Sequence, residues 1–368
     1  MLESTTTVTV KKKGTSLHPR RMEIISCLFR PMDIVLVFIL LYDLSAPYIL
    51  FAQTGRERLI VAYAAVNPIV LPLWIAVEKG FFDSEGLDVQ FVYIRNSPTM
   101  LSAIVSGDIQ VAYTGGTAVL SAAARGLDLQ IVANTRSKLT YDIVARPEIK
   151  KPADLRGKVF GVQALGGTVW MGAVLGLEYL GLDPVRDNVK LIPFGDQTLL
   201  AQALEARRID ATVLDKPSST ELKQKGFVFL AELSKADIPF AGTGLTFRRS
   251  FIQRRAEAVR RAMRALVRAN AFIFSPPNKT DVVEIIARKL GVQNRAVAAS
   301  TYDAGLQMIN QRPYPNIRGL ENIRRLLGRL NPDIAKVPVE TVVDMTFMDE
   351  LEKSGFIDKV MRTGGKVP

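Results

Sequence analysis

Histidine and cysteine, the side chains most often used for general-base catalysis and transition-metal binding, each occur once among the 368 residues, as His18 and Cys27. A structural zinc site takes about four cysteine or histidine ligands, which one of each cannot supply. A Ser-His-Asp or Cys-His catalytic site needs a histidine inside the folded domain. A lone cysteine also excludes an intrachain disulfide. Whether the chain performs such chemistry therefore depends on where these two residues lie.

Both residues lie in an N-terminal segment with the pattern of an export signal. Residues 1–31 are basic and polar, residues 34–41 form an apolar run, and residues 44–52 end in the small residue Ala52 beside the polar Gln53. A basic region, an apolar core and a small-residue cleavage site define a secretory signal peptide. We therefore expect residues 1–52 to be a leader cleaved after Ala52, with the true start codon left open. The mature chain would contain no histidine and no cysteine, which suits an oxidising compartment.

An uncleaved membrane anchor is the alternative interpretation of this segment. Residues 34–52 approach the roughly 20 residues that a membrane helix needs. Asp43 lies in the middle of them, and a carboxylate at the centre of a membrane helix costs about 2.5–3.5 kcal/mol on insertion scales. We therefore favour export to the periplasm, with a membrane tether through residues 34–52 as the alternative.

After the leader, apolar runs alternate with amphipathic segments. The pattern predicts strands at 58–64, 87–94, 109–113, 129–133 and 141–145, with helices between them that end at glycine. The alternation restarts at residue 158, and from residue 254 onward the chain is expected to be helical. Strands that alternate with helices predict parallel sheets covered by helices on both faces.

Two segments rich in proline and glycine, 146–152 and 238–244, indicate where the chain crosses between two lobes. Residues 53–149 and 243–368 would form lobe one with the C-terminal helices, and residues 150–242 would form lobe two. Two strands that link two α/β lobes form a hinge. Ligands of open α/β sheets bind at the carboxyl ends of the strands, so the site is expected there.

The segment 72–89, PLWIAVEKGFFDSEGLDV, resembles the opening of periplasmic solute-binding proteins of ABC importers. The group it resembles is the nitrate/sulfonate/taurine and thiamin-pyrimidine-precursor family. The resemblance extends over residues 58–358, because further segments fit in order and spacing: 106–112, 151–158, 181–184, 203–211 and 351–356. It implies an α/β protein with the type II periplasmic-binding-protein fold, in which two lobes are joined by a two-strand hinge.

The same resemblance implies a function without catalysis. The protein would close on a small anionic organic ligand, such as a sulfonate or carboxylate, and deliver it to an ABC permease in the inner membrane. We expect a monomer with no metal and no cofactor. One alternative is an enzyme like the thiamin-pyrimidine synthases of this family, but these depend on a histidine and a cysteine-rich segment, which the chain lacks after residue 52. A membrane-tethered ligand sensor is the other alternative.

Members of the family place ligands at loops between strands and helices, and three loops here match. Glycine permits close approach of a ligand, and the free N–H groups of the following helix favour an anion. Ordinary capped turns are the alternative for the first two loops, and charges that simply face solvent are the alternative for the third. A P-loop lysine is missing from the second loop, which disfavours nucleotide hydrolysis. The expected ligand-binding residues in these loops are Thr114, Gly115, Gly116 and Thr117, then Gly166, Gly167 and Thr168, then Asp215 and Lys216.

Two further residues complete the expected site. Asn67 follows the first strand, and Arg136 follows the fourth. A guanidinium group binds a carboxylate or sulfonate through two parallel hydrogen bonds, although a solvent-facing arginine is the more frequent case. Trp170 could stack on a ligand, but we favour a place in the core.

The net charge of +12 suggests an anionic partner, and the densest basic segment is a predicted helix with six arginines. No zinc finger, helix-turn-helix or RNA-binding signature accompanies them, so no nucleic-acid partner is expected. We expect a solvated helix face, with contact to a permease or to anionic lipid as the alternative. These arginines are Arg254, Arg255, Arg260, Arg261, Arg264 and Arg268.

Overall fold

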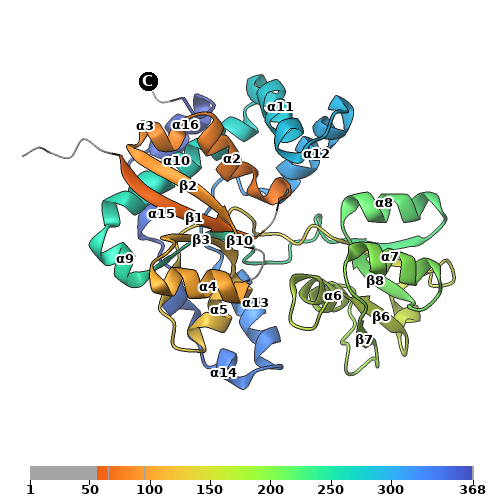
Figure 1. Cartoon of the computed structure of the whole chain (residues 1–368). Coiled ribbons are helices and arrows are strands. Elements are labelled where there is room, and N and C mark those ends of the chain that lie inside the picture. Colours follow the sequence, from red (N-terminus) through yellow and green to blue (C-terminus); the bar gives the residue numbers. More distant parts are fainter. Residues whose placement is uncertain (1–55, 65, 95–96, 367–368) are drawn as a thin grey trace, which may run out of the picture. The chain divides into compact units, whose positions relative to one another are not determined.

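Two five-stranded sheets organise the computed structural model, which describes residues 56–366 except 65 and 95–96 (Figure 1). The first sheet has the order β2-β1-β3-β10-β4 and the second the order β7-β6-β8-β5-β9. The first sheet consists of β1 (Glu57–Tyr63), β2 (Leu87–Tyr93), β3 (Val111–Gly115), β4 (Leu129–Ile131) and β10 (Thr243–Arg248). The second consists of β5 (Asp142–Ala145), β6 (Val159–Val162), β7 (Lys190–Pro193), β8 (Ala211–Leu214) and β9 (Val228–Glu232).

The two sheets share one topology, and it is mixed rather than purely parallel. In the first sheet β10 runs antiparallel to both of its neighbours, β3 and β4. In the second sheet β5 runs antiparallel to β8 and β9 in the same way. The expectation of wholly parallel sheets was therefore wrong for one strand in each sheet. Both exceptions are the strands that the chain enters directly after crossing from the other sheet.

Helices cover both sheets, as the alternation of apolar runs predicted. Figure 1 shows α6, α7 and α8 around the second sheet. These helices are α6 (Thr168–Tyr179), α7 (Gln197–Glu205) and α8 (Lys216–Gln224), with the short η2 (Pro152–Leu155) before them. Among the described residues, none of the helices is both long enough and apolar enough to span a membrane.

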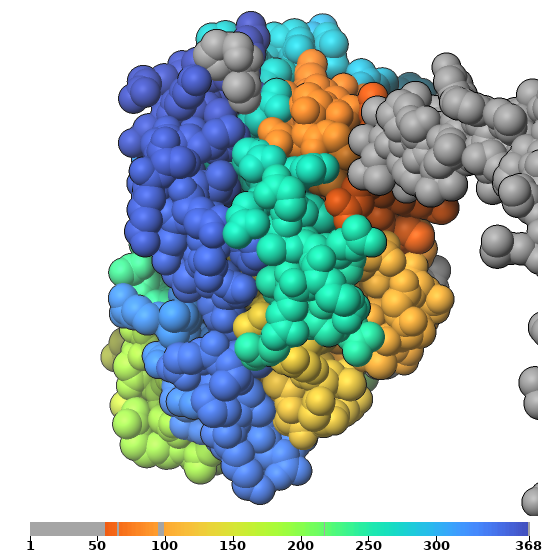
Figure 2. Space-filling view, turned by 90° about the vertical axis from the view of Figure 1, so that its left-hand side faces the viewer, coloured from red at the N-terminus to blue at the C-terminus, as the bar shows by residue number. Residues whose placement is uncertain are grey.

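The first sheet carries the other helices. The N-terminal ones are η1 (Pro68–Val70), α2 (Leu71–Glu78), α3 (Phe81–Ser84), α4 (Ser97–Ser106) and α5 (Gly116–Ala123). The C-terminal ones are α9 (Arg249–Arg254), α10 (Ala256–Phe274), η3 (Pro276–Asn278), α11 (Lys279–Leu290), α12 (Arg295–Met308), α13 (Ile317–Gly328), α14 (Pro332–Ala335), η4 (Val339–Val342), α15 (Thr346–Lys353) and α16 (Phe356–Arg362). In the space-filling view the dark blue C-terminal residues lie beside the teal α9–α10 segment (Figure 2).

Alternating residues of β1 face two different hydrophobic clusters, because successive side chains of a strand point to opposite faces. Val61 belongs to the cluster that includes α2 and α10. Ala62 belongs to a cluster that includes α4, α5 and the apolar residues of the second sheet. Trp170 lies in this second cluster and is 6% exposed, so its place in the core is confirmed.

The chain crosses to the second sheet earlier than its prolines suggested. β5 pairs with β8 and β9, so the crossing segment lies at 132–141, and a crossing at 146–152 was wrong. Arg146 already belongs to the second lobe, where its Nη2 lies 2.8 Å from a carboxylate oxygen of Asp210. The return crossing at 233–242 overlaps the predicted segment. The leader expected at residues 1–52 lies outside the described part of the chain.

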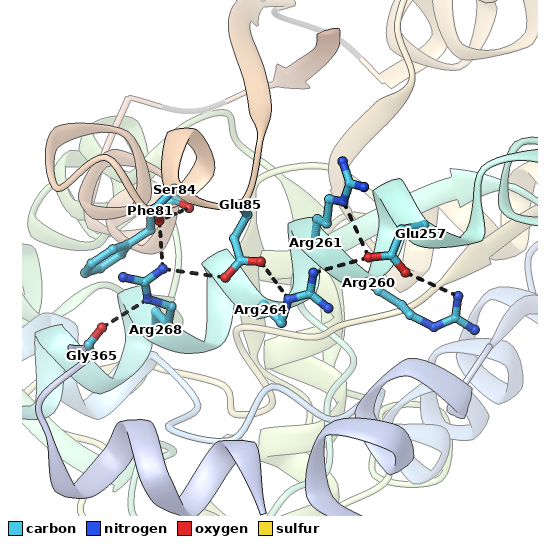
Figure 3. A network of polar contacts seen from close by, with 9 residues as sticks. All are labelled: Phe81, Ser84, Glu85, Glu257, Arg260, Arg261, Arg264, Arg268 and Gly365. Atoms are coloured by element: carbon cyan, nitrogen blue, oxygen red, sulfur yellow. Dashed lines mark hydrogen bonds and ion pairs between the residues drawn. The ribbon is translucent and has the colours of Figure 1, made fainter. Parts of the chain in front are cut away.

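The basic face of α10 is occupied by carboxylates of the chain itself (Figure 3). Nε of Arg264 lies 2.6 Å from Glu85, and Nη1 of Arg268 lies 3.5 Å from the same carboxylate. Arg260 lies 2.7 Å from Glu350 of α15. The arginines therefore join α10 to its neighbours, instead of forming the wholly solvated face that the sequence predicted.

Candidate ligand-binding site

A cavity of about 200 Å³ lies where β1 and β3 end, beside both crossing segments and the start of α6. Most of its wall comes from lobe one and the crossings, and Thr168 contributes from lobe two. Five residues expected from the sequence line it: Thr114, Gly115, Thr117, Arg136 and Thr168. Strand ends and helix starts thus meet at one place, as in other α/β proteins.

Arg136 is the cationic residue of this wall, and it is only 6% exposed. Its Nε donates a hydrogen bond to the carbonyl oxygen of Lys138 at 3.2 Å. Its Nη2 is buried without a hydrogen-bond partner, and Arg136 has no ion pair within the described ranges. A buried charge without an anionic partner costs several kcal/mol of stability, so an anion bound at this cavity would stabilise the folded chain.

Two aromatic rings lie near this guanidinium group. Its central carbon is 5.8 Å from the ring centroid of Tyr141 and 5.8 Å from that of Phe240. An aromatic face attracts a cation through its quadrupole and accepts none of its strong hydrogen bonds. The rings therefore stabilise the positive charge and leave Nη2 without a partner.

Two helices begin at the cavity without a side-chain cap. The N-cap of α5 is Gly115 and that of α6 is Gly167, and neither makes a side-chain hydrogen bond to its helix. The first N–H groups of a helix have no partner within the helix, and they favour a negative charge. The N–H of Gly116 is already used, because it donates to the carbonyl oxygen of Ala241 at 3.0 Å. Gly116 packs tightly instead, since a Cβ there would lie 2.6 Å from Leu320.

The return crossing supplies cavity residues that the sequence analysis did not identify: Phe240, Ala241, Gly242 and Thr243. Gly242 donates to the carbonyl oxygen of Arg136 at 3.0 Å, and Asn134 Nδ2 donates back to Gly242 at 2.9 Å. A Cβ on Gly242 would lie 2.9 Å from the carbonyl oxygen of Arg136, so the two crossings touch only because this residue is glycine. The glycines at 242 and 244 are the available signal, and their pattern alone indicates only a crossing between the lobes.

Tyr113 lies in the cavity wall beside these segments. Its hydroxyl donates to the carbonyl oxygen of Ile69 at 2.9 Å and contacts the hydroxyl of Thr135. Burial raises the pKa of Tyr113 above its ordinary value, so the phenol stays neutral. It therefore contributes a fixed polar wall and no charge.

The other expected residues do not line the cavity. Asn67 accepts a hydrogen bond from the N–H of Ile69, which caps η1, and Asp215 caps α8 through the N–H of Ser218. Gly166 has a φ of +76°, which favours glycine, and Gly167 caps α6. These residues build the turns around the site, and a direct role in binding stays a prediction for them.

Lys216 is engaged within lobe two. Its Nζ lies 2.6 Å from Glu232 and 3.5 Å from Asp142. Asp142 is 2% exposed and accepts a hydrogen bond from Ser219. Burial raises the pKa of Asp142, and the Ser219 hydroxyl and the Lys216 ammonium oppose that shift. The cluster fixes the start of β5 to the first turn of α8. Among the described residues, no group of three or more acidic, histidine or cysteine side chains is arranged to hold a metal.

Sequence comparison supports the same architecture. The model of the family described as NMT1/THI5 like matches residues 67–280, more than half of the chain. The chain belongs to the NMT1/THI5-like family. This NMT1/THI5-like protein is 28% identical over 224 residues to a Brucella abortus protein named as a binding protein, covering 59% of the chain and 67% of the relative. It is 24% identical over 233 residues to the riboflavin-binding protein RibY of Chloroflexus aurantiacus, covering 62% and 66%.

Solved structures confirm the expected periplasmic-binding-protein fold. The alkanesulfonate-binding protein SsuA of Xanthomonas axonopodis pv. citri, bound to MOPS, matches with a TM-score of 0.57 at 18% identity, over 78% of this chain and 98% of its own. The nitrate-binding protein NrtA of Synechocystis PCC 6803 matches with a TM-score of 0.59 at 14% identity, over 81% and 89%. DSZB in complex with biphenyl-2-sulfinic acid also shares the fold of this NMT1/THI5-like protein, with a TM-score of 0.59 at 19% identity, over 81% and 99%.

Proposed function

We propose that this protein is an extracytoplasmic solute-binding protein that takes up a small organic anion beside Arg136 and passes it to an ABC importer. The buried and unpartnered Nη2 of Arg136 carries this proposal. A carboxylate or sulfonate placed there would accept charge-assisted hydrogen bonds and neutralise the buried cation. The uncapped starts of α5 and α6 favour the same charge.

The cavity limits the ligand further. Its volume of about 200 Å³ is below the roughly 300–1,000 Å³ of pockets for drug-sized ligands. Arg136 is its cationic side chain, and no acidic side chain is among the described residues that line it. The ligand best suited to this wall is therefore small and carries one negative charge, with no ammonium group that would need a carboxylate.

The position of the site between the lobes supports a role in transport. Thr168 of lobe two and Thr114 of lobe one line the same cavity, so a ligand there can contact both lobes. Such a ligand favours the closed state by its differential affinity for it. The names of SsuA and NrtA, a sulfonate-binding and a periplasmic nitrate-binding protein, support a role as the binding component of an importer. Catalysis of the thiamin-pyrimidine-synthase type is opposed by the absence of histidine and cysteine after residue 52.

Binding of small anions and of matched neutral molecules tests the proposal. Propane-1-sulfonate and pentanoate are compared with propane-1-sulfonamide and pentanamide by thermal shift and titration calorimetry at constant ionic strength. We expect saturable 1:1 binding of an anion, with a higher affinity and a larger rise in Tm than its neutral counterpart produces.

Arg136→Met makes the test specific to the site. Hydrogen bonds to a charged group contribute about 1.5–3 kcal/mol, so the variant should lose at least about tenfold in affinity. The ligand-free variant should be as stable as the wild type or more stable, because an unpaired buried charge is removed. Arg208→Met is the control, since Arg208 is exposed and lies 5.2 Å from the ring of Phe194. Equal anion affinity in Arg136→Met and the wild type would refute the proposal.

A further inference from the structure

The guanidinium group of Arg136 lies between the two crossing segments, and one flanking ring comes from each of them. Tyr141 ends the first crossing and Phe240 belongs to the second. Both ring centroids lie 5.8 Å from the central carbon of the guanidinium group. The cation therefore contacts both connections between the lobes.

Each ring belongs to a residue that packs on a different lobe. The backbone of Phe240 packs on α13, where a Cβ at Gly319 would lie 2.8 Å from the Cα of Phe240. Tyr141 packs on α6 of lobe two, where a Cβ at Gly172 would lie 3.1 Å from its ring. The contact at Gly319 is close enough to require glycine, and the contact at Gly172 is tighter than an ordinary van der Waals contact. The distance between the two rings consequently depends on how the lobes are arranged about the crossings.

A second arginine of the chain, which lies beside one ring and one carboxylate, can be compared with Arg136. The guanidinium group of Arg260 also lies 5.8 Å from a buried ring, that of Phe347. Arg260, however, donates through Nε and Nη2 to the carboxylate of Glu350 at 2.7 and 3.2 Å. A carboxylate uses the donors and cancels the charge, whereas a ring leaves both available. Arg136 differs from Arg260 in having a second ring in place of the carboxylate.

We infer that Tyr141 and Phe240 are positioning residues of the anion site, which hold the guanidinium group of Arg136 in the cavity wall and leave its buried Nη2 without a hydrogen-bond partner. The inference rests on the proposed function. It adds Tyr141, which is not among the residues that line the cavity, and gives Phe240 of the cavity wall a second role toward Arg136. A free arginine side chain loses about 1.5–2 kcal/mol of rotamer entropy when it is ordered. The rings order it before the anion arrives, so that this cost does not weaken binding.

Two measurements test the inference. The first is the NMR signal of the Arg136 Nε–H in the ligand-free protein, assigned by its loss in Arg136→Lys. Tyr141→Leu and Phe240→Leu should broaden or shift this signal, and Tyr141→Phe should preserve it. Phe347→Leu is the matched control for Phe240→Leu, because it removes a ring that is as buried as Phe240 and as close to an arginine elsewhere.

The second measurement is the ratio of the affinities for propane-1-sulfonate and propane-1-sulfonamide. One cation–π contact is worth about 1 kcal/mol when it is partly desolvated, so each leucine variant should lower the sulfonate affinity about fivefold. The sulfonamide affinity should not change in Tyr141→Leu, because Tyr141 is not among the lining residues and the sulfonamide carries no charge. In Phe240→Leu, which alters the cavity wall, the sulfonamide should lose less affinity than the sulfonate. A general packing defect would weaken both ligands equally, and that outcome would overturn the inference.

The two measurements also separate the inference from the proposed function. An unchanged Nε–H signal in both leucine variants overturns the positioning role, whatever the wild type binds. Failure of the wild type to bind any anion of the panel overturns the proposed function instead. The signal of the ligand-free protein does not depend on that second result, so the two failures are distinguishable.

Discussion

A methyl group at Gly319 would collide with the return crossing, which forms part of the cavity wall. Gly319 is the third residue of α13, and a Cβ there would lie 2.3 Å from the backbone nitrogen of Ala241 and 2.4 Å from the carbonyl carbon of Phe240. Backbone atoms cannot rotate away, so the return crossing would have to move. Overpacking costs about 1–3 kcal/mol, and replacing glycine by alanine in a helix returns up to about 1 kcal/mol. We expect Gly319→Ala to lower the free energy of unfolding by about 2 kcal/mol.

Unfolding in urea, followed by tryptophan fluorescence, measures this loss. Trp74 lies in α2 of lobe one and Trp170 in α6 of lobe two, so each lobe carries one reporter. Gly305→Ala is the matched control, because a Cβ at this helical glycine of α12 would meet its nearest atoms at 3.9 Å. The control should gain up to about 1 kcal/mol. Propane-1-sulfonate should bind more weakly to Gly319→Ala and normally to the control.

Equal stability of Gly319→Ala and Gly305→Ala would refute the reasoning. It would mean that the return crossing yields to α13 at no cost. Loss of stability without loss of sulfonate affinity would contradict the assignment of residues 240–243 to the ligand site.

Three further substitutions probe the charged groups of the fold. Glu85→Gln should lower the free energy of unfolding in urea by about 1.5–3 kcal/mol, because this carboxylate is 12% exposed and lies between two arginines. Glu257 is half-exposed, so Glu257→Gln should change the free energy of unfolding by less than about 1 kcal/mol. Burial raises the pKa of Asp142 in the folded protein. The wild type should therefore gain stability relative to Asp142→Asn as the pH falls through that raised pKa. The gain should be complete below the unfolded pKa of about 3.9 and absent above the folded pKa. Arg325→Ala breaks the 2.7 Å contacts that join α13 to Glu178 of α6. The substitution should change the sulfonate affinity less than about fivefold, and high salt should remove the difference from the wild type. Calorimetry at two salt concentrations measures both.

Each of these expectations has a contrary outcome. Equal losses in Glu85→Gln and Glu257→Gln would show that burial of Glu85 does not strengthen its ion pairs. Parallel stability profiles of the wild type and Asp142→Asn between about pH 3 and pH 7 would contradict the raised pKa. An effect of Arg325→Ala that persists at high salt would point to packing between the lobes rather than charge.

The sequence predicted the elements of the fold better than their pairing. The segment 141–145 was correctly expected to be a strand, and it was assigned to the wrong lobe. The period and composition that identify a strand depend on its own residues. The partners of this strand are β8 and β9, which lie far along the chain. The antiparallel direction of β10 escaped prediction for the same reason.

The site residues were likewise predicted where neighbouring residues indicate them and missed where distant residues decide their contacts. Thr114, Thr117 and Thr168 were expected from their places at strand ends and helix starts, and they lie at the cavity. Lys216 had the same local signature, but two carboxylates from other strands hold it. Phe240 was missed because neither its type nor its neighbours indicate chemistry. Its contribution depends on Arg136, more than 100 residues earlier in the chain.

The position of β10 has a consequence for how the molecule is assembled during synthesis. β10 lies between β3 and β4 and provides the hydrogen bonds that join them, yet its residues follow the whole of the second sheet in the chain. The N-terminal sheet therefore has a gap at its fourth position until residue 248 has emerged from the ribosome. The second sheet has all five of its strands once residue 232 is made, so it can be completed first. The last strand of the second sheet is thus synthesised before the last strand of the first, although the chain enters the first sheet first.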